Sequence, residues 1–260
     1  MTLFFLVRDI RENTDMQYAS EDKRLFITAG IALGLAGDKL ASGIPDEDKD
    51  YYNAIFALKE EFREHQKDEF ALILAVTPWE YFGPNANGDA LFAKPFYQIR
   101  SESVLPKTCS TLVTRAMLSR NHKYSDPETC SIGDVIQANY NEKYKRVEVF
   151  ARYSWEKAPS ECNRLRRGSS LLTSMGYRIY APDLPAYSGE FCSFCGTHAR
   201  IPAQRCIHLS TKNNTILNGI PIFMMNGDGY FVDLSSIVIP GDMNSRTIVR
   251  LTESKEEKVK

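Results

Sequence analysis

The feature that most constrains this chain is a group of potential metal ligands in its C-terminal third: Cys192, Cys195, Cys206 and His208. They read Cys-x2-Cys, a spacer of ten residues, and Cys-x-His. A Cys-x2-Cys turn directs two sulfur atoms at one metal ion, and a further thiolate and an imidazole complete the tetrahedral set that zinc prefers. The spacing therefore predicts a zinc site. Because all four ligands come from the protein, no position stays open for a catalytic water, and the predicted zinc is structural.

The predicted zinc would pin a loop at about residues 190–210. Ordering such a loop costs conformational entropy that a segment without its own core cannot recover, and metal binding offsets this cost. His198 lies inside the loop and is a spare ligand candidate. A nucleic-acid-binding zinc knuckle is the alternative, but only Arg200 and Arg205 add positive charge to the loop. We therefore interpret the loop as a zinc-stapled insert.

Composition places the rest of the chain among ordinary globular proteins. Of its 260 residues, 43% are hydrophobic and 25% are charged, which is enough apolar material for a sizeable core. The formal net charge is −1, so bulk charge predicts neither nucleic-acid nor acidic-membrane binding. No apolar run approaches the roughly 20 residues of a membrane span. The cysteines outside the metal-ligand group are scattered, which is typical of a reducing compartment.

The hydrophobic pattern divides the chain at about residue 78. An N-terminal α/β extension, residues 1–78, begins with a predicted strand at 1–8. A helix is expected from about 45 to 65, and the apolar run at 70–77 is compatible with a strand. The last segment, 253–260, is a charged tail that is expected to fray.

Residues 79–252 form one predicted domain of strands, turns and helices. Asn87-Gly88 predicts a turn with positive φ, and Gly227-Asp228-Gly229 predicts a hairpin between two apolar strands. The expected elements are helices at 103–119 and 158–171, strands at 174–180, 220–225 and 229–239, and two further strands around a polar turn within 133–153.

The chain has only four histidines, which shortens the search for a general base. His65 lies on the polar part of a predicted helix, and His198 and His208 belong to the zinc loop. His122 is the histidine that remains available for catalysis.

Ser174 is the matching candidate for a nucleophile. A serine hydroxyl is weakly reactive unless an imidazole removes its proton, and the imidazole needs a third group that orients it. Gly176 follows two residues later and would allow close backbone approach by a substrate. Ser169 and Ser170 are rival nucleophiles, but they fall at the expected end of a helix.

Four motifs follow one another between residues 80 and 250: Asn85-x-Asn87-Gly88-Asp89, Asn121-His122-Lys123, Ser174-Met175-Gly176 and Phe231-Val232-Asp233-Leu234-Ser235-Ser236-Ile237-Val238-Ile239-Pro240-Gly241-Asp242. In this order they resemble the prohead (capsid maturation) serine proteases of tailed bacteriophages. Some members of that family look similar in a further respect, because they carry a Cys-x2-Cys…Cys-x-His insert after the serine.

The resemblance implies an α+β fold like that of the herpesvirus assembly proteases, a small β-barrel flanked by helices, here with the zinc-stapled insert and the N-terminal extension. It implies Ser174 as the nucleophile and His122 as the general base. Asp233 occupies the acidic position of the family's acid-x-Ser-x-Val strand and is the expected third member. Glu148 is the substitute, and related viral enzymes use a second histidine instead.

The expected function is that of a phage prohead serine endopeptidase, which would cleave scaffold and capsid proteins, and itself, during head maturation. Its partners would be the major capsid protein and the scaffold or core proteins, and its place would be the procapsid or virion in the host cytoplasm. Self-association stays open, and no membrane or nucleic-acid partner is expected. The alternatives are an inactive protease-fold virion protein with a structural zinc site, and a zinc-binding adaptor.

Overall fold

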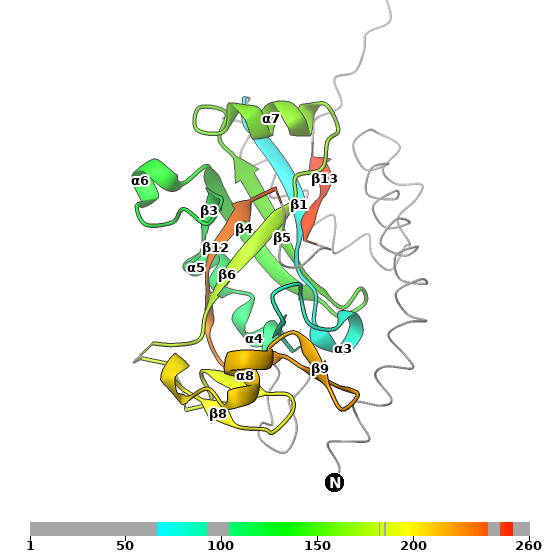
Figure 1. The fold of residues 1–260 in the computed structure, drawn as a ribbon. Coiled ribbons are helices and arrows are strands. Elements are labelled where there is room, and N and C mark those ends of the chain that lie inside the picture. Colours follow the sequence, from blue (N-terminus) through cyan, green and yellow to red (C-terminus); the bar gives the residue numbers. More distant parts are fainter. Residues whose placement is uncertain (1–66, 93–103, 182, 185, 239–244, 252–260) are drawn as a thin grey trace, which may run out of the picture.

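The computed structural model describes residues 67–92, 104–181, 183–184, 186–238 and 245–251. The predicted strand at 1–8, the predicted helix at 45–65 with His65, and the charged tail at 253–260 lie outside these residues. The described part is a mixed α/β structure that consists mostly of strands (Figure 1). None of its helices is long and apolar enough to cross a membrane.

The centre of the structure is a seven-stranded sheet with the order β13-β1-β5-β4-β3-β12-β6. Its strands are β1 (Glu69–Val76), β3 (Met117–Arg120), β4 (Gly133–Asn141), β5 (Arg146–Tyr153), β6 (Thr173–Arg178), β12 (Tyr230–Ser236) and β13 (Arg246–Leu251). Neighbouring strands are antiparallel except for β3 and β12, which run parallel. The sheet therefore brings residues from distant parts of the sequence onto adjacent strands.

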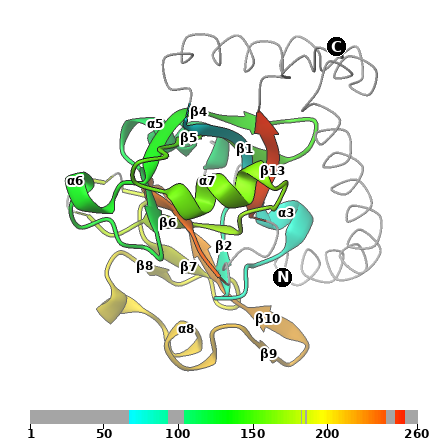
Figure 2. The same cartoon turned by 90° about the horizontal axis from the view of Figure 1, so that it is seen from above.

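The sheet curls into a half-barrel, which Figure 2 shows from above. Its two edges approach each other at one end. The Thr173 N–H donates to the Ser245 carbonyl at 3.0 Å, and the Thr247 N–H donates to the Leu171 carbonyl at 2.8 Å. The edges therefore meet at the start of β6, and in the described part of the chain no strand pairs with the outer edge of β6 beyond this point.

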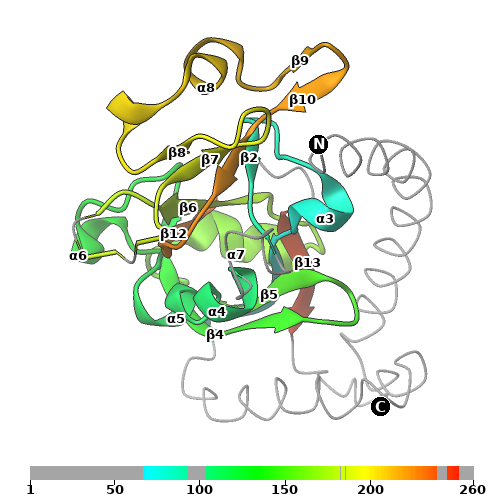
Figure 3. The same ribbon diagram turned by 90° about the horizontal axis from the view of Figure 1, so that it is seen from below.

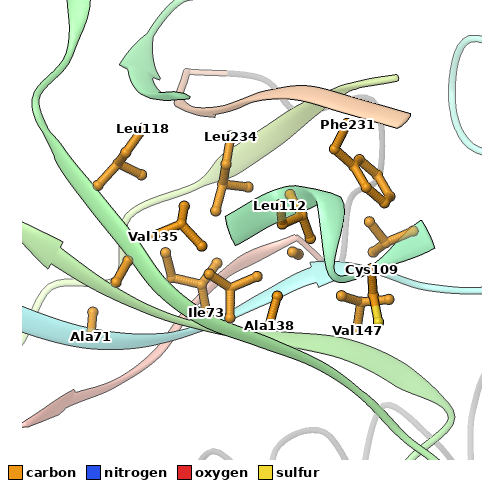
Figure 4. Packing of buried hydrophobic residues seen from close by; sticks show 14 of the residues in the cluster. Ala71, Ile73, Cys109, Leu112, Leu118, Val135, Ala138, Val147, Phe231 and Leu234 are labelled. Carbon is orange, nitrogen blue, oxygen red and sulfur yellow. The ribbon is translucent and has the colours of Figure 1, made fainter. Parts of the chain in front are cut away.

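The concave side of the sheet holds the main hydrophobic core. Leu112, in the short helix Thr111–Thr114, and Cys109, which directly follows the helix Leu105–Thr108, point toward side chains of the strands (Figure 4). Strand periodicity sends alternate residues to opposite faces, so Leu118 of β3 and Leu234 of β12 enter this core while their neighbours face away from it. Ser119, Asp233 and Ser235 are among the residues that turn away, and they build the candidate active site.

The described helices are all short. They are α3 (Trp79–Phe82), α4 (Leu105–Thr108), α5 (Thr111–Thr114), α6 (Pro127–Cys130), α7 (Pro159–Arg166) and α8 (Ile207–Lys212), with a 3₁₀ turn at Pro202–Gln204. Helix α7 has Pro159 at its first position and ends before Gly168, whose φ of 74° suits the left-handed end of a helix.

A smaller lobe packs beside the main sheet (Figure 3). It contains a four-stranded sheet with the order β2-β11-β7-β8 and a separate hairpin, β9-β10. The strands are β2 (Asp89–Ala90), β7 (Glu190–Cys192), β8 (His198–Ala199), β9 (Thr215–Leu217), β10 (Ile220–Ile222) and β11 (Met224–Asn226). We call this part, with α8, the metal lobe because it carries the predicted zinc ligands.

The structure confirms several predicted elements and corrects others. The strands predicted within 133–153, the helix in 158–171 and the turn at Gly88, whose φ is 75°, are present. The hairpin predicted at 227–229 is wrong, because β11 pairs in the small sheet whereas β12 pairs in the large one. The helix predicted at 103–119 is two short helices followed by β3.

The predicted boundary at residue 78 also needs correction. The predicted extension, residues 1–78, includes β1, but this strand lies between β13 and β5 in the large sheet. All eight of its residues are buried. A strand that is buried along its whole length belongs to the core of the domain, which therefore includes residues from Glu69 onward.

Candidate active site and metal cluster

His122 and Asp233 form a direct pair on the side of the large sheet that faces away from the core. The Nδ1 atom of His122 lies 3.0 Å from Oδ2 of Asp233. Asp233 is completely buried, whereas the imidazole is partly exposed. A carboxylate can only accept, so Nδ1 carries the proton in this contact and Nε2 is left as the basic nitrogen. This is the arrangement that a serine nucleophile requires of its base.

The parallel pairing of β3 and β12 explains how His122 reaches Asp233. Strand β3 ends at Arg120, which is in register with Ser236 of β12. Asn121 and His122 then adopt left-handed conformations, with φ of 50° and 57°. The Asn121 N–H donates to the Ser236 carbonyl at 3.1 Å. The chain thus turns back over β12 and carries the imidazole to the carboxylate of Asp233, three residues before Ser236.

Two buried serines hold this pair in place. The hydroxyl of Ser235 donates to Asp233 Oδ2 at 2.5 Å and accepts the backbone N–H of His122 at 3.0 Å. Ser119, the neighbour of Ser235 on β3, lies 2.6 Å from it, oxygen to oxygen. Ser235 therefore fixes both the carboxylate and the backbone of the histidine.

Gly176 leaves the space that the Asp233 carboxylate occupies. The two residues are paired across β6 and β12. A Cβ atom at position 176 would lie 2.1 Å from Oδ1 of Asp233, which is far inside contact distance. The glycine in the Ser-Met-Gly motif is thus required by the acid opposite it, a reason that only the pairing of β6 with β12 reveals.

Ser174 lies on the same face of the sheet as this network. It is directly opposite Ser235 in the antiparallel pair, where Cα atoms are about 4.5–5.5 Å apart and side chains share a face. Its side chain is 8% exposed and lines a cleft with a volume of about 550 Å³. No hydrogen bond joins Ser174 Oγ to His122 in the described residues. This contact is often long in substrate-free serine hydrolases.

The cleft runs between β6 and the metal lobe. Consecutive residues from Ser174 to Tyr180 line one side, including Met175 and Tyr177, whose side chains pack against the core. A cleft lined by both inward-facing and outward-facing residues of one strand follows the edge of that strand. The outer edge of β6 is therefore open to the cleft next to Ser174.

The four predicted zinc ligands converge in the metal lobe. The donor atoms of Cys192, Cys195, Cys206 and His208 all lie within 4.8 Å of one another. The sulfur atoms of Cys195 and Cys206 are 3.5 Å apart. A tetrahedral ion with bonds of about 2.3 Å to sulfur sets its ligands at about this separation. The group could hold a metal ion such as zinc, as the spacing predicted.

Two further observations fit a metal at this place. Nδ1 of His208 is buried and has no hydrogen-bond partner in the described residues. A bond to a metal ion would give this buried nitrogen a partner. Burial acts to raise the pKa of the Cys195 thiol, but hydrogen bonds from Thr197 and contacts with His208 and Cys206 outweigh it and lower the pKa to about 6. A thiol of this kind yields the thiolate that binds metal.

The remaining candidates from the sequence lie elsewhere. Nε2 of His198 lies 2.8 Å from the Ser188 carbonyl, and the ring stacks on Phe191, so His198 is outside the ligand group. Glu148 is buried against Arg146 and Asn141, whereas Asp233 contacts the histidine. The rival nucleophile Ser170 donates its hydroxyl proton to the Thr247 carbonyl at 2.7 Å.

Sequence reasoning missed two groups. The first is the pair Ser119 and Ser235, although Ser235 stands two residues after Asp233, where a strand returns to the same face. The second is the ion pair between Glu190 and Arg205, which lines the cleft. Each of these residues stands one or two positions before a predicted zinc ligand, so this part of the cleft wall is next to the metal-ligand group in the sequence.

Comparisons of this chain with models of protein families, with curated proteins and with solved structures find no match.

Proposed function

We propose that the protein is a serine endopeptidase that matures the heads of a tailed bacteriophage by cleaving scaffold and capsid proteins and itself. The observation that carries the proposal is the buried Asp233 with its 3.0 Å contact to His122, on the strand adjacent to Ser174. The proposed role in head maturation rests only on the order of the four motifs between residues 80 and 250. The proposed hydrolytic chemistry rests on the arrangement of Ser174, His122 and Asp233.

In the proposed reaction, Ser174 Oγ attacks the carbonyl carbon of a peptide bond while Nε2 of His122 takes the hydroxyl proton. Asp233 accepts the Nδ1–H throughout and stabilises the imidazolium that forms. The same imidazole then gives its proton to the leaving amine, and the acyl group stays on Ser174. Water, deprotonated by His122, hydrolyses the ester and restores the enzyme.

The cleft suits an extended polypeptide. Its lining follows the outer edge of β6 next to Ser174, and no described strand pairs with that edge, so an extended peptide could add to the sheet there. Recognition through the backbone accepts many sequences, whereas pockets for alternate side chains select among them. A protease that cleaves several head proteins needs both properties.

In this proposal the metal lobe supplies the opposite wall. Cys192 ends β7, two residues after Glu190, and Cys206 directly follows Arg205. Bound zinc would hold these segments and with them the ion pair that lines the cleft. Its role is structural, because the four protein ligands fill a tetrahedral shell.

The test uses the full chain, loaded with zinc, together with the capsid and scaffold proteins of the same phage. Wild-type protein is expected to cut them at defined sites read by mass spectrometry, and Ser174→Ala is expected to leave them intact. The matched control is Ser170→Ala, because Ser170 stands only four residues before Ser174 but its hydroxyl is engaged by the Thr247 carbonyl. If Ser174→Ala cleaves these proteins as efficiently as wild type does, the assignment of Ser174 as the nucleophile is wrong.

The alternative is an inactive virion component with the same fold. The observation in its favour is the lack of a hydrogen bond between Ser174 and His122 in the described residues. It predicts that wild-type protein stays bound to the head proteins without cutting any of them, even when zinc is present.

A further inference from the structure

The far side of the cleft, opposite β6, contains an acid that the proposed reaction does not use. Asp89 lines the cleft together with Asn226 of β11. Strand β2 carries Asp89 beside β11, with Met224 as its partner in register. The acid is thus part of the small sheet that forms the wall.

Asp89 has no ion-pair partner among the described residues. Burial raises the pKa of its carboxyl group and nearby Glu190 adds to the effect, whereas the Asn226 amide, Arg205 and the Asn85 side chain only partly offset it. The contact from the Asn226 Nδ2 to the Asp89 carboxylate is long, at 3.5 Å. Arg205, the nearest cation in this wall, is engaged by both carboxylate oxygens of Glu190. The carboxylate therefore faces the cleft without a full complement of donors.

Asn226 adds a second unsatisfied acceptor. Its side chain is 8% exposed, and Oδ1 is buried without a hydrogen-bond partner in the described part of the chain. A buried amide oxygen without a donor is costly, and native structures seldom keep one without a reason. Two acceptors side by side, one of them charged, call for a ligand group that donates several hydrogen bonds and carries positive charge.

The site is rigid before any ligand arrives. Oδ1 of Asn85 accepts the backbone N–H groups of Asn87 and Asp89, at 2.9 and 3.0 Å. From the metal lobe, Asn213 and Asn214 donate to the carbonyls of Asn87 and Ala86, both at 3.0 Å. The turn that carries Asp89 is thus clamped from two sides. Preorganised acceptors of this kind distinguish ligands more sharply than mobile ones.

We propose that Asp89 and Asn226 form a specificity subsite that takes a basic side chain, lysine or arginine, of the polypeptide substrate at a fixed distance from the cleaved bond. This inference rests on the proposed endopeptidase function. The remaining cation of the cleft, Arg178, is exposed and lies over the ring of Tyr230 at 6.0 Å from its centroid, and it forms no ion pair with Asp89 in the described residues.

The experiment cleaves a mixed library of natural peptides with the full, zinc-loaded protein and reads the residues around every cut. Lysine or arginine is expected to be enriched at one position. For a cleaved peptide with that residue, Asp89→Asn is expected to lower kcat/KM by about 10- to 100-fold, the size of a lost hydrogen bond to a charged group. The same peptide with norleucine at that position is expected to be cut equally by both proteins.

Two controls separate this proposal from the one on which it rests. A fluorophosphonate probe reacts with an activated serine without any peptide, so Asp89→Asn is expected to label like wild type. Glu142→Gln, which changes an exposed acid outside the cleft, is expected to keep the wild-type preference. Labelling and cleavage without a basic preference would overturn the subsite and leave the endopeptidase standing. Absence of both labelling and cleavage would overturn the proposed function and the subsite with it.

Discussion

The metal-ligand group and the candidate active site are built in opposite ways. The ligands Cys192 to His208 lie close together in the sequence, and one lobe brings their donor atoms within 4.8 Å. Ser174, His122 and Asp233 are far apart in the sequence and become neighbours only through the order β3-β12-β6. A local site depends on spacing, whereas a dispersed site depends on strand register. A change in strand register should therefore damage the candidate active site and leave the metal-ligand group intact. Loss of a metal ligand should have its main effect on the metal lobe.

The largest expected effect is on the dispersed site. Asp233→Asn keeps the shape of the side chain but removes the charge that orients His122 and stabilises its protonated form. We expect kcat to fall by about 10⁴-fold. Steady-state hydrolysis of a cleaved peptide measures it, with Asp183→Asn, an exposed acid, as the matched control. Metal content should stay unchanged, and a fall of less than tenfold would remove Asp233 from the proposed triad.

Removal of the metal tests the local site. A chelator, or Cys206→Ser, should destabilise the metal lobe because bound ion stabilises only the folded ligand set. With free zinc about 1,000-fold above its Kd, the loss in unfolding free energy is about 4 kcal/mol. Denaturation with and without chelator measures it. Cys130→Ser, outside the ligand group, should bind metal as wild type does; equal stability of Cys206→Ser and wild type would contradict the site.

Gly176→Ala tests the register that joins β6 to β12. The added Cβ would collide with Oδ1 of Asp233, so the carboxylate must move away from His122. A displacement of this size should lower kcat by about 100-fold. Gly168→Ala, where a Cβ meets no atom within 4 Å but the φ of 74° is unfavourable, should cost about 1–2 kcal/mol of stability and keep kcat. The opposite pattern would show that the acid is not held as described.

The smallest expected effects on kcat concern the two buried serines, Ser235 and Ser119. Ser235→Ala removes one donor to Asp233 and the acceptor of the His122 N–H, but the direct contact of acid and imidazole stays. We expect kcat to fall about tenfold with KM unchanged, because a hydrogen bond to a charged group contributes about 1.5 kcal/mol and tenfold in rate corresponds to about 1.4 kcal/mol. Ser119→Ala should have a smaller effect, since its contact with Asp233 is longer, at 3.4 Å. A change confined to KM would speak against a positioning role.

The contrast also explains what the sequence could predict. Spacing alone identified the metal ligands, and alternation predicted β4 and β5, because both signals are local. The hairpin predicted at 227–229 failed because local pattern cannot tell that β11 and β12 belong to different sheets. The acid opposite Gly176 and the subsite at Asp89 depend on pairings across more than fifty residues. No pattern within one segment encodes such pairings.

A mass-spectrometric map of a fluorophosphonate adduct on the zinc-loaded protein tests the proposed catalytic unit of Ser174, His122 and Asp233. The chemistry described here predicts one adduct, on Ser174, and its loss in His122→Ala with the metal content unchanged. An adduct on Ser169 or Ser170, or equal labelling of Ser174 without His122, would contradict the claim that the three strands assemble a catalytic unit.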